Sequence, residues 1–156
     1  MEISTYVASS GSVDGHMVYV GDYDGRFSAV DLEAQKTVWT FSNKTANLPF
    51  IASPALEGST VYIGNRDKFM YALDKNDGSL KWKYNTGSRV DASAVVVGSR
   101  LLVANMRGDV FLLDRETGKP VWNYELGTPV HANPAVAGGR FYVAGDDGRI
   151  YCFGKE

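Results

Sequence analysis

Two short stretches of the chain have the carboxylate-rich composition of a calcium-binding loop. They are Asp22–Gly25 (DYDG) and Asp74–Gly78 (DKNDG). Oxygen ligands suit Ca²⁺, but an EF-hand loop continues with spaced ligands to a bidentate glutamate at its twelfth position, which neither stretch does. Both stretches also recur at hairpin positions in a sequence repeat, and Asp, Asn and Gly favour tight turns. We therefore interpret them as hairpin turns and expect no bound metal.

The histidines and the cysteine are the other candidates for chemistry. Neither His16 nor His131 recurs between repeats, and no nucleophile, base and orienting acid can be assembled around either. Cys152 is the single cysteine, so no intrachain disulfide is possible and the redox state of the compartment is left open. We therefore predict no catalytic residue.

The bulk composition excludes some partners. The 156 residues suffice for one domain with a core, and 44% of them are hydrophobic. The net charge of −2 gives no general field that would attract nucleic acid, and we expect none as a partner. No apolar run approaches the roughly 20 residues that span a bilayer. A membrane span is therefore not expected.

The chain contains an internal sequence repeat with a period of about 40 residues. Three kinds of residue recur in one register, separated by 43, 40 and, for the glycines, a further 40 residues: Gly15, Gly58, Gly98 and Gly138; Asp31, Asp74 and Asp114; Trp39, Trp82 and Trp122. A fixed period of this length indicates a solenoid or a propeller. The predicted repeats span about 7–49, 50–89, 90–129 and 130–156.

Each repeat divides into short β-rich runs that are separated by turn residues. The second repeat gives four predicted antiparallel strands: Ile51–Leu56, Thr60–Gly64, Phe69–Asp74 and Leu80–Tyr84. Val, Ile, Tyr, Phe and Trp dominate these runs, and no sustained helical period appears. Four-stranded units of about 40 residues are the blades of a β-propeller. The sequence therefore predicts an all-β propeller of about four blades.

One face of this propeller is a candidate binding site. The first position of each innermost strand should surround one mouth of the central channel: Ala8, Ile51, Asp91 and His131. The loops between second and third strands should open on the same face, with Tyr23, Arg66, Met106, Arg107 and Asp147. Such a mixture of aromatic, basic and apolar groups suits a protein or peptide contact, although an ordinary solvated rim would look similar. Our candidate residues are Asp91, His131, Tyr23, Arg66 and Arg107.

The stretch Asp114–Trp122 (DRETGKPVW) resembles the repeat of the quinoprotein-like, pyrroloquinoline-quinone-type β-propeller family. Two more copies of the signature contain Asp74, Gly78 and Trp82, and Asp31, Gln35 and Trp39. The resemblance covers essentially the whole chain, and it implies that Trp39, Trp82 and Trp122 dock each blade against its neighbour. Large aromatic side chains contribute most to such packing.

The family includes periplasmic quinone- and calcium-dependent dehydrogenases. It also includes non-catalytic scaffolds, such as the lipoprotein that assists β-barrel assembly in the bacterial outer membrane. Quinoprotein alcohol dehydrogenases usually carry a vicinal cysteine disulfide, which a single cysteine cannot form. We therefore expect a non-enzymatic interaction scaffold without a cofactor, which is extracytoplasmic if it follows the family's habit. The alternatives are a cofactor-binding fragment of a dehydrogenase and an engineered repeat protein without a ligand.

The blade count raises the question of how the ring is completed. The fourth repeat is expected to lack its outer strand, and the family's usual ring has eight blades. Three explanations are open: a fragment of a longer protein, a half-propeller that dimerises, and a closed four-bladed ring. We predict a homodimer that forms one eight-bladed ring through equivalent head-to-tail junctions.

Overall fold

The computed structural model describes residues 6–44 and 46–154 and contains only β-strands, turns and loops in these ranges. Sheet 1 is formed by β1 (Ser12–Asp14), β2 (Met17–Gly21), β3 (Arg26–Asp31) and β4 (Lys36–Ser42). Sheet 2 is formed by β5 (Ala55–Glu57), β6 (Thr60–Gly64), β7 (Phe69–Asp74) and β8 (Leu80–Asn85). Neighbouring strands pair antiparallel in chain order, so each sheet is a simple meander.

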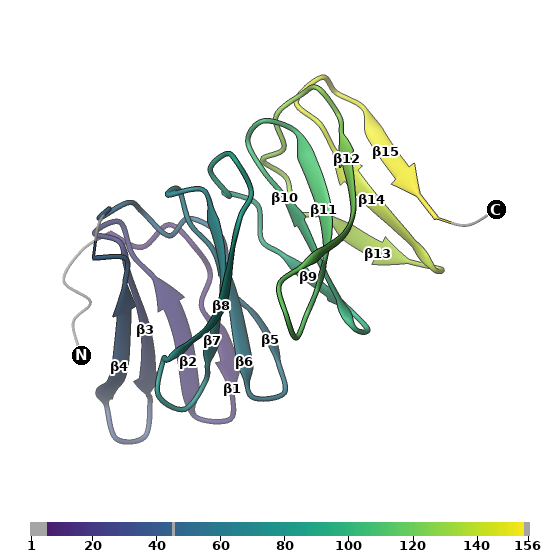
Figure 1. The fold of residues 1–156 in the computed structure, drawn as a ribbon. Coiled ribbons are helices and arrows are strands. Elements are labelled where there is room, and N and C mark those ends of the chain that lie inside the picture. Colours follow the sequence, from purple (N-terminus) through teal and green to yellow (C-terminus); the bar gives the residue numbers. More distant parts are fainter. Residues whose placement is uncertain (1–5, 45, 155–156) are drawn as a thin grey trace.

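The other two sheets continue the series. Sheet 3 is formed by β9 (Val95–Val97), β10 (Arg100–Ala104), β11 (Asp109–Asp114) and β12 (Pro120–Glu125). Sheet 4 is formed by β13 (Ala135–Ala137), β14 (Arg140–Ala144) and β15 (Ile150–Phe153). Among the described residues, sheet 4 thus has three strands, whereas the other sheets have four. The sheets follow one another along an open arc from the N-terminal to the C-terminal side (Figure 1).

The innermost strands are shorter than the sequence suggested. We expected a strand over Ile51–Leu56, but β5 begins at Ala55. Pro54 has no N–H to donate to a ladder, and the N–H of Ser53 donates to the hydroxyl of Ser93 at 2.9 Å. The backbone before β5 therefore bonds to the next sheet instead of its own.

The third and fourth strands share an irregularity in sheets 1 to 3. The register shifts after Ala29, Ala72 and Leu112, which pair with Trp39, Trp82 and Trp122 respectively. A bulge bends the outer strand and increases its local twist. Each tryptophan therefore lies at the same position beside a bulge. The three side chains leave their outer strands from equivalent backbone positions.

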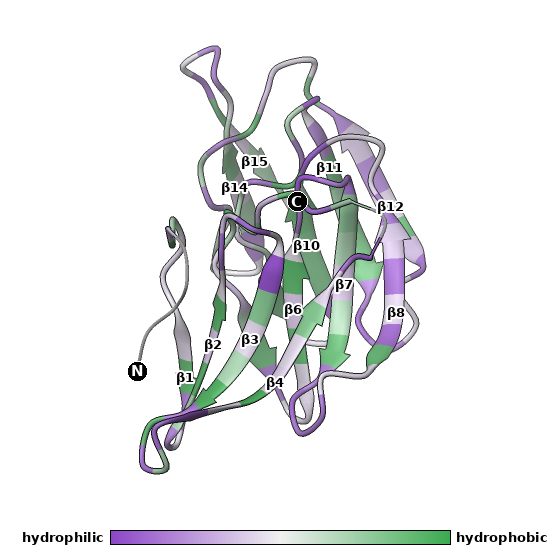
Figure 2. Ribbon diagram, turned by 90° about the vertical axis from the view of Figure 1, so that its left-hand side faces the viewer, coloured by the Kyte–Doolittle hydropathy of each residue, from purple (hydrophilic) through white to green (hydrophobic). Residues whose placement is uncertain are grey.

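The core lies between the sheets. One buried cluster joins sheets 1 and 2, a second joins sheets 2 and 3, and a third joins sheets 3 and 4. Inner strands β6 and β10 are almost completely buried, whereas β8 and β12 are mostly exposed. Figure 2 shows the corresponding change from hydrophobic inner strands to more hydrophilic outer strands. In the ranges that the structure covers, no helix is long and apolar enough to cross a membrane.

Candidate binding face and sheet junctions

The loops between second and third strands lie at the same end of the strands in every sheet. We call this side of the arc the mouth face. Each loop begins with a backbone hydrogen bond to the segment that leads into its sheet. The donor and acceptor residues are Tyr23 and Tyr6, Arg66 and Pro49, Met106 and Arg89, and Asp146 and Pro129. Buried Asn65 and Asn105 add side-chain bonds from Nδ2 to the carbonyls of Leu48 and Thr86. These repeated bonds fix the loops to the connections between sheets.

Arg66 and Asp91 form a bidentate ion pair on the mouth face. Arg66 Nη2 lies 2.8 Å from Asp91 Oδ2, and its Nε donates to Oδ1 at 3.0 Å. The Asp91 side chain is only 7% exposed, compared with 31% for Arg66. Bidentate pairs of this kind are geometrically specific. Asp91 therefore holds a loop of sheet 2 against the start of sheet 3 and is not presented as an unpaired carboxylate.

His131 occupies the position equivalent to Asp91 but has a different contact. Its Nδ1 lies 2.8 Å from Asp146 Oδ2, within the loop of its own sheet. Both side chains are well exposed, at 58% and 42%. Next to this pair, the Tyr151 hydroxyl donates to Asp147 and holds the pKa of that carboxyl below its ordinary value. The histidine is thus an exposed polar group with an acidic neighbour.

Tyr23 and Arg107 are the other exposed candidates. Tyr23 is 41% exposed and its ring makes an edge contact with Tyr6 at 5.2 Å between centroids. The Arg107 side chain is 59% exposed and pairs with Asp109, which also accepts a hydrogen bond from Asn105 Nδ2. Of the five candidates, only Arg66 and Asp91 contact each other through their side chains. The others come from separate sheets.

The structure places the aspartates of the calcium-like stretches in turns. Asp22 Oδ1 accepts the Arg26 N–H at 2.8 Å, and Asp74 Oδ1 accepts the Asn76 N–H at 2.8 Å. No group of three or more His, Cys, Asp or Glu within the described ranges could hold a metal ion. The mouth-face carboxylates Asp91 and Asp109 are already engaged by arginines. These two carboxylates are therefore not presented as free ligands for Ca²⁺.

Trp39 and Trp82 lie against the next sheet in equivalent ways. Their Nε1 atoms donate to the carbonyls of Lys75 and Arg115, at 2.8 and 2.9 Å. Their rings cover Gly78 and Gly118, where an added Cβ would come within 2.6 Å of ring carbons. The resemblance to the quinoprotein-like family implied that these tryptophans dock each sheet against its neighbour. We propose this role for Trp39 and Trp82 on the basis of these contacts.

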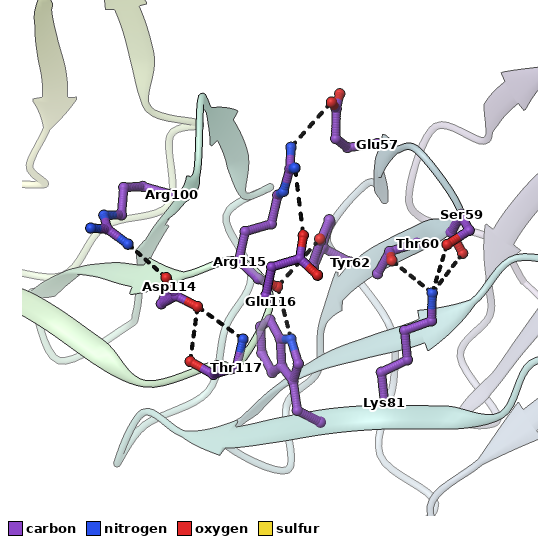
Figure 3. A network of polar contacts seen from close by, with 11 residues as sticks. Glu57, Ser59, Thr60, Tyr62, Lys81, Arg100, Asp114, Arg115, Glu116 and Thr117 are labelled. Carbon is purple, nitrogen blue, oxygen red and sulfur yellow. Dashed lines mark hydrogen bonds and ion pairs between the residues drawn. The ribbon is translucent and has the colours of Figure 1, made fainter.

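Lys75 and Arg115 also bind the preceding sheet through their side chains. Lys75 pairs with Asp14, and Arg115 Nη1 lies 3.1 Å from Glu57 Oε1. Their carbonyls accept further bonds from the hydroxyls of Tyr19 and Tyr62, each at 3.4 Å. Figure 3 shows this arrangement around Arg115, which we call the outer contact. Sequence reasoning missed it, although the basic residues that follow two of the three repeated aspartates were a signal.

The junction between sheets 3 and 4 differs. Trp122 packs edge-on against Phe141 and Phe153, with ring centroids 5.5 and 5.3 Å apart. Beside these rings lies a mostly apolar cavity of about 540 Å³, which is also lined by Val97 and Leu112. Val97 stands where sheets 1 and 2 have Asp14 and Glu57. The position equivalent to Lys75 and Arg115 in sheet 4 is residue 155, which lies outside the described residues.

A series of hydrogen bonds joins the sheets near the central channel. The N–H groups of Ser10 and Ser53 donate to the hydroxyls of Ser53 and Ser93, at 3.1 and 2.9 Å. The N–H of Ser93 then donates to Asn133 Oδ1 at 2.7 Å. We call this the inner series. It was also missed, although a small polar residue recurs at one position of every repeat.

These features define a β-propeller arc built from pyrroloquinoline-quinone-type repeats. The family model described as outer membrane protein assembly factor BamB matches residues 4–93 and 71–156. The chain therefore belongs to this family.

Solved structures show the same fold. BamB from Moraxella catarrhalis superposes with a TM-score of 0.86 at 21% identity, over 99% of this chain and 48% of that chain. The computationally designed protein Ika4 gives a TM-score of 0.84 at 11% identity, over 98% of this chain and 93% of that chain. The arc thus corresponds to half of an eight-bladed ring.

Dehydrogenases are similar over shorter segments. The quinohemoprotein alcohol dehydrogenase of Comamonas testosteroni is 33% identical over 76 residues, which cover 43% of this chain and 11% of the relative. The enzyme ADH IIB of Pseudomonas putida is 31% identical over 80 residues, or 46% of this chain and 12% of the relative. The chain therefore matches only a small part of these curated relatives.

Proposed function

We propose that this chain is a non-enzymatic β-propeller scaffold that binds a protein or peptide at its mouth face. The observation that carries the proposal is the presence of three well-exposed side chains on loops and connections of the mouth face: Tyr23, Arg107 and His131. Aromatic and arginine side chains contribute strongly to protein interfaces. The repeated backbone bonds fix these loops, which lowers the entropy cost of binding.

The charges of the mouth face favour a peptide with both polar and apolar groups. Arg66, Arg107 and His131 each have a carboxylate neighbour, so these three side chains do not form an uncompensated basic surface. A polyanion such as nucleic acid would need such a surface. Tyr23 adds an exposed ring beside these paired charges. The face therefore suits a protein segment that combines hydrogen-bonding groups with an apolar side chain.

The family match supports this choice and suggests a place of action. Its description names an outer membrane protein assembly factor, and the M. catarrhalis structure carries the same name. We infer a role outside the bacterial cytoplasm, in the envelope. The homodimer predicted from the sequence is also part of this proposal.

The alternative function is cofactor binding as a piece of a quinone-dependent dehydrogenase, which the C. testosteroni match favours. Adding pyrroloquinoline quinone with Ca²⁺ to the purified chain separates the two functions. We expect an unchanged melting temperature and an unshifted quinone absorbance. A saturable shift in either quantity would favour the cofactor-binding alternative.

The binding proposal is tested by site-specific photo-crosslinking in envelope extract. A photoreactive residue at position 23 or 107 should give one discrete adduct, which mass spectrometry can identify. The control is the same residue at Ser99, which is exposed on a hairpin at the opposite end of the strands. Equal adducts from positions 23, 107 and 99, or none from any of them, would reject the mouth face as the binding site.

A further inference from the structure

We propose that two copies of this chain join by continuing the inner series, with the N–H of Asn133 in one copy donating to the hydroxyl of Ser10 in the other. This inference rests on the proposed homodimer and names the residues that form its two junctions.

The inner series has complementary ends. Each internal member accepts a hydrogen bond from the preceding sheet and donates one to the next, as Ser53 does. Within the described part of the chain, Ser10 donates in this series but accepts nothing, and Asn133 accepts but does not donate. If sheet 1 of a second copy packs against sheet 4, the Ser10 hydroxyl of that copy comes next to the N–H of Asn133. The two junctions are equivalent by the twofold axis.

The outer positions of the two ends are also matched. At the junctions of sheet 1 with sheet 2 and of sheet 2 with sheet 3, a basic residue faces an acidic one, as Arg115 faces Glu57. The equivalent position in sheet 1 is Leu32, which is 50% exposed, and the equivalent position in sheet 4 is Ala137. Two uncharged residues would therefore meet, so that neither copy buries an unpaired charge at this point.

Gln35 and Tyr142 fit the same junction. Gln35 occupies the register of Gly78 and Gly118, which lie under tryptophan rings. The three tryptophans of the chain belong to sheets 1 to 3, so none would cover Gln35 when sheet 4 of another copy packs there. Tyr142 occupies the register of Tyr19 and Tyr62, and its hydroxyl would donate to the carbonyl of Leu32.

The exposed faces contain apolar groups that such a junction would cover. In sheet 4, Val143 faces the third cluster, so the alternating residues Ile150 and Cys152 lie on the opposite, exposed face. Ile150 is 74% exposed. In sheet 1, Tyr19 faces sheet 2, which leaves Val13 and Val18 on the free face, and Val13 is 61% exposed. Exposed apolar patches of this kind mark interfaces.

Disulfide trapping tests the pairing of Ser10 with Asn133. We combine Ser10→Cys and Asn133→Cys with Cys152→Ser, which removes the native thiol. Because internal members of the series are in direct contact, the two new cysteines should come within the roughly 4 to 7 Å between Cα atoms that a disulfide requires. Oxidation should convert most of the chain to a covalent dimer on a non-reducing gel. The positive control is Ser53→Cys with Ser93→Cys, which should form a bond within one chain.

Three outcomes are distinguishable. A covalent dimer at low protein concentration, absent from each single cysteine variant mixed with the Cys152→Ser parent, supports the proposed junction. A parent that is dimeric by mass but does not cross-link, while the control does, overturns the junction and leaves the homodimer. A monomeric parent overturns both. As a second readout, Leu32→Glu should weaken dimerisation at least about tenfold, whereas Leu80→Glu on the exposed strand β8 should not; equal affinities would overturn the outer match.

Discussion

At the residue scale, the close approach of each tryptophan to a glycine explains part of the repeated signature. Gly118 has a φ of +70°, and an added Cβ would lie 2.6 Å from the Trp82 ring. Gly98 has a similar φ of +56°, but nothing lies within 4 Å of the same atom. The two positions therefore separate the cost of the backbone conformation from the cost of displacing the ring.

We predict that Gly118→Ala lowers the free energy of unfolding more than Gly98→Ala does. The left-handed conformation costs each variant about 1 to 2 kcal/mol. Displacement of Trp82 adds about 1 to 3 kcal/mol to Gly118→Ala alone. Urea unfolding followed by tryptophan fluorescence measures both values. Equal losses would show that the ring does not hold this position.

The turn aspartates also predict a pH dependence. The Thr117 hydroxyl and N–H hold the pKa of Asp114 below its ordinary value of 3.8, and the Asn76 N–H does the same for Asp74. A lowered pKa in the folded state contributes stability above the unfolded pKa, and this contribution is lost as the pH falls through the folded pKa.

Asp114→Asn should therefore reduce the loss of stability between about pH 6 and about pH 3, because the variant has no carboxyl to protonate at this turn. Urea midpoints at the two pH values measure the effect. Asp24→Asn, at an exposed aspartate in the loop between β2 and β3, serves as the control. If Asp114→Asn lost as much stability on acidification as the unmodified chain, the turn carboxylate would not be responsible.

At the element scale, the sequence predicted the strands better than the contacts between sheets. The predicted strands Thr60–Gly64 and Phe69–Asp74 coincide with β6 and β7, because their apolar runs are bounded by turn residues. The innermost strand was placed too early, because its first residues bond to a neighbouring sheet. The outer contact depends on main-chain carbonyls such as that of Arg115, and a carbonyl has no signature in the sequence.

The candidate binding site shows the same limit. The repeat register placed Asp91 and His131 at equivalent positions of consecutive sheets. It did not reveal that Asp91 is nearly buried against Arg66 or that His131 pairs with Asp146. Asp91 is contacted by a loop of the preceding sheet, whereas His131 is contacted by the loop of its own sheet. The repeat pattern does not predict this difference.

The inner series gives a prediction at the same scale. Ser93→Ala removes the acceptor of the Ser53 N–H, and such a loss costs about 1 kcal/mol. We expect faster amide hydrogen exchange at Ser53, with little change in the strands of sheet 4. Ser99→Ala, at an exposed hairpin, is the control. Unchanged exchange at Ser53 would show that the bond does not protect this segment.

At the scale of the whole molecule, the two ends of the arc are built differently from its internal junctions. Leu32, Gln35 and Ala137 replace the basic, glycine and acidic residues that the junctions of sheets 1 with 2 and 2 with 3 use. These replacements favour a ring closed by a second copy.

The mass of the native particle tests this account most directly. Sedimentation equilibrium of the 156-residue chain at micromolar concentration should give twice the 17.0 kDa chain mass, and the dimer should dissociate only on dilution. Leu32→Glu should shift the distribution toward the single chain at the same concentration. A folded particle of 17.0 kDa at every concentration tested would contradict the eight-bladed homodimer.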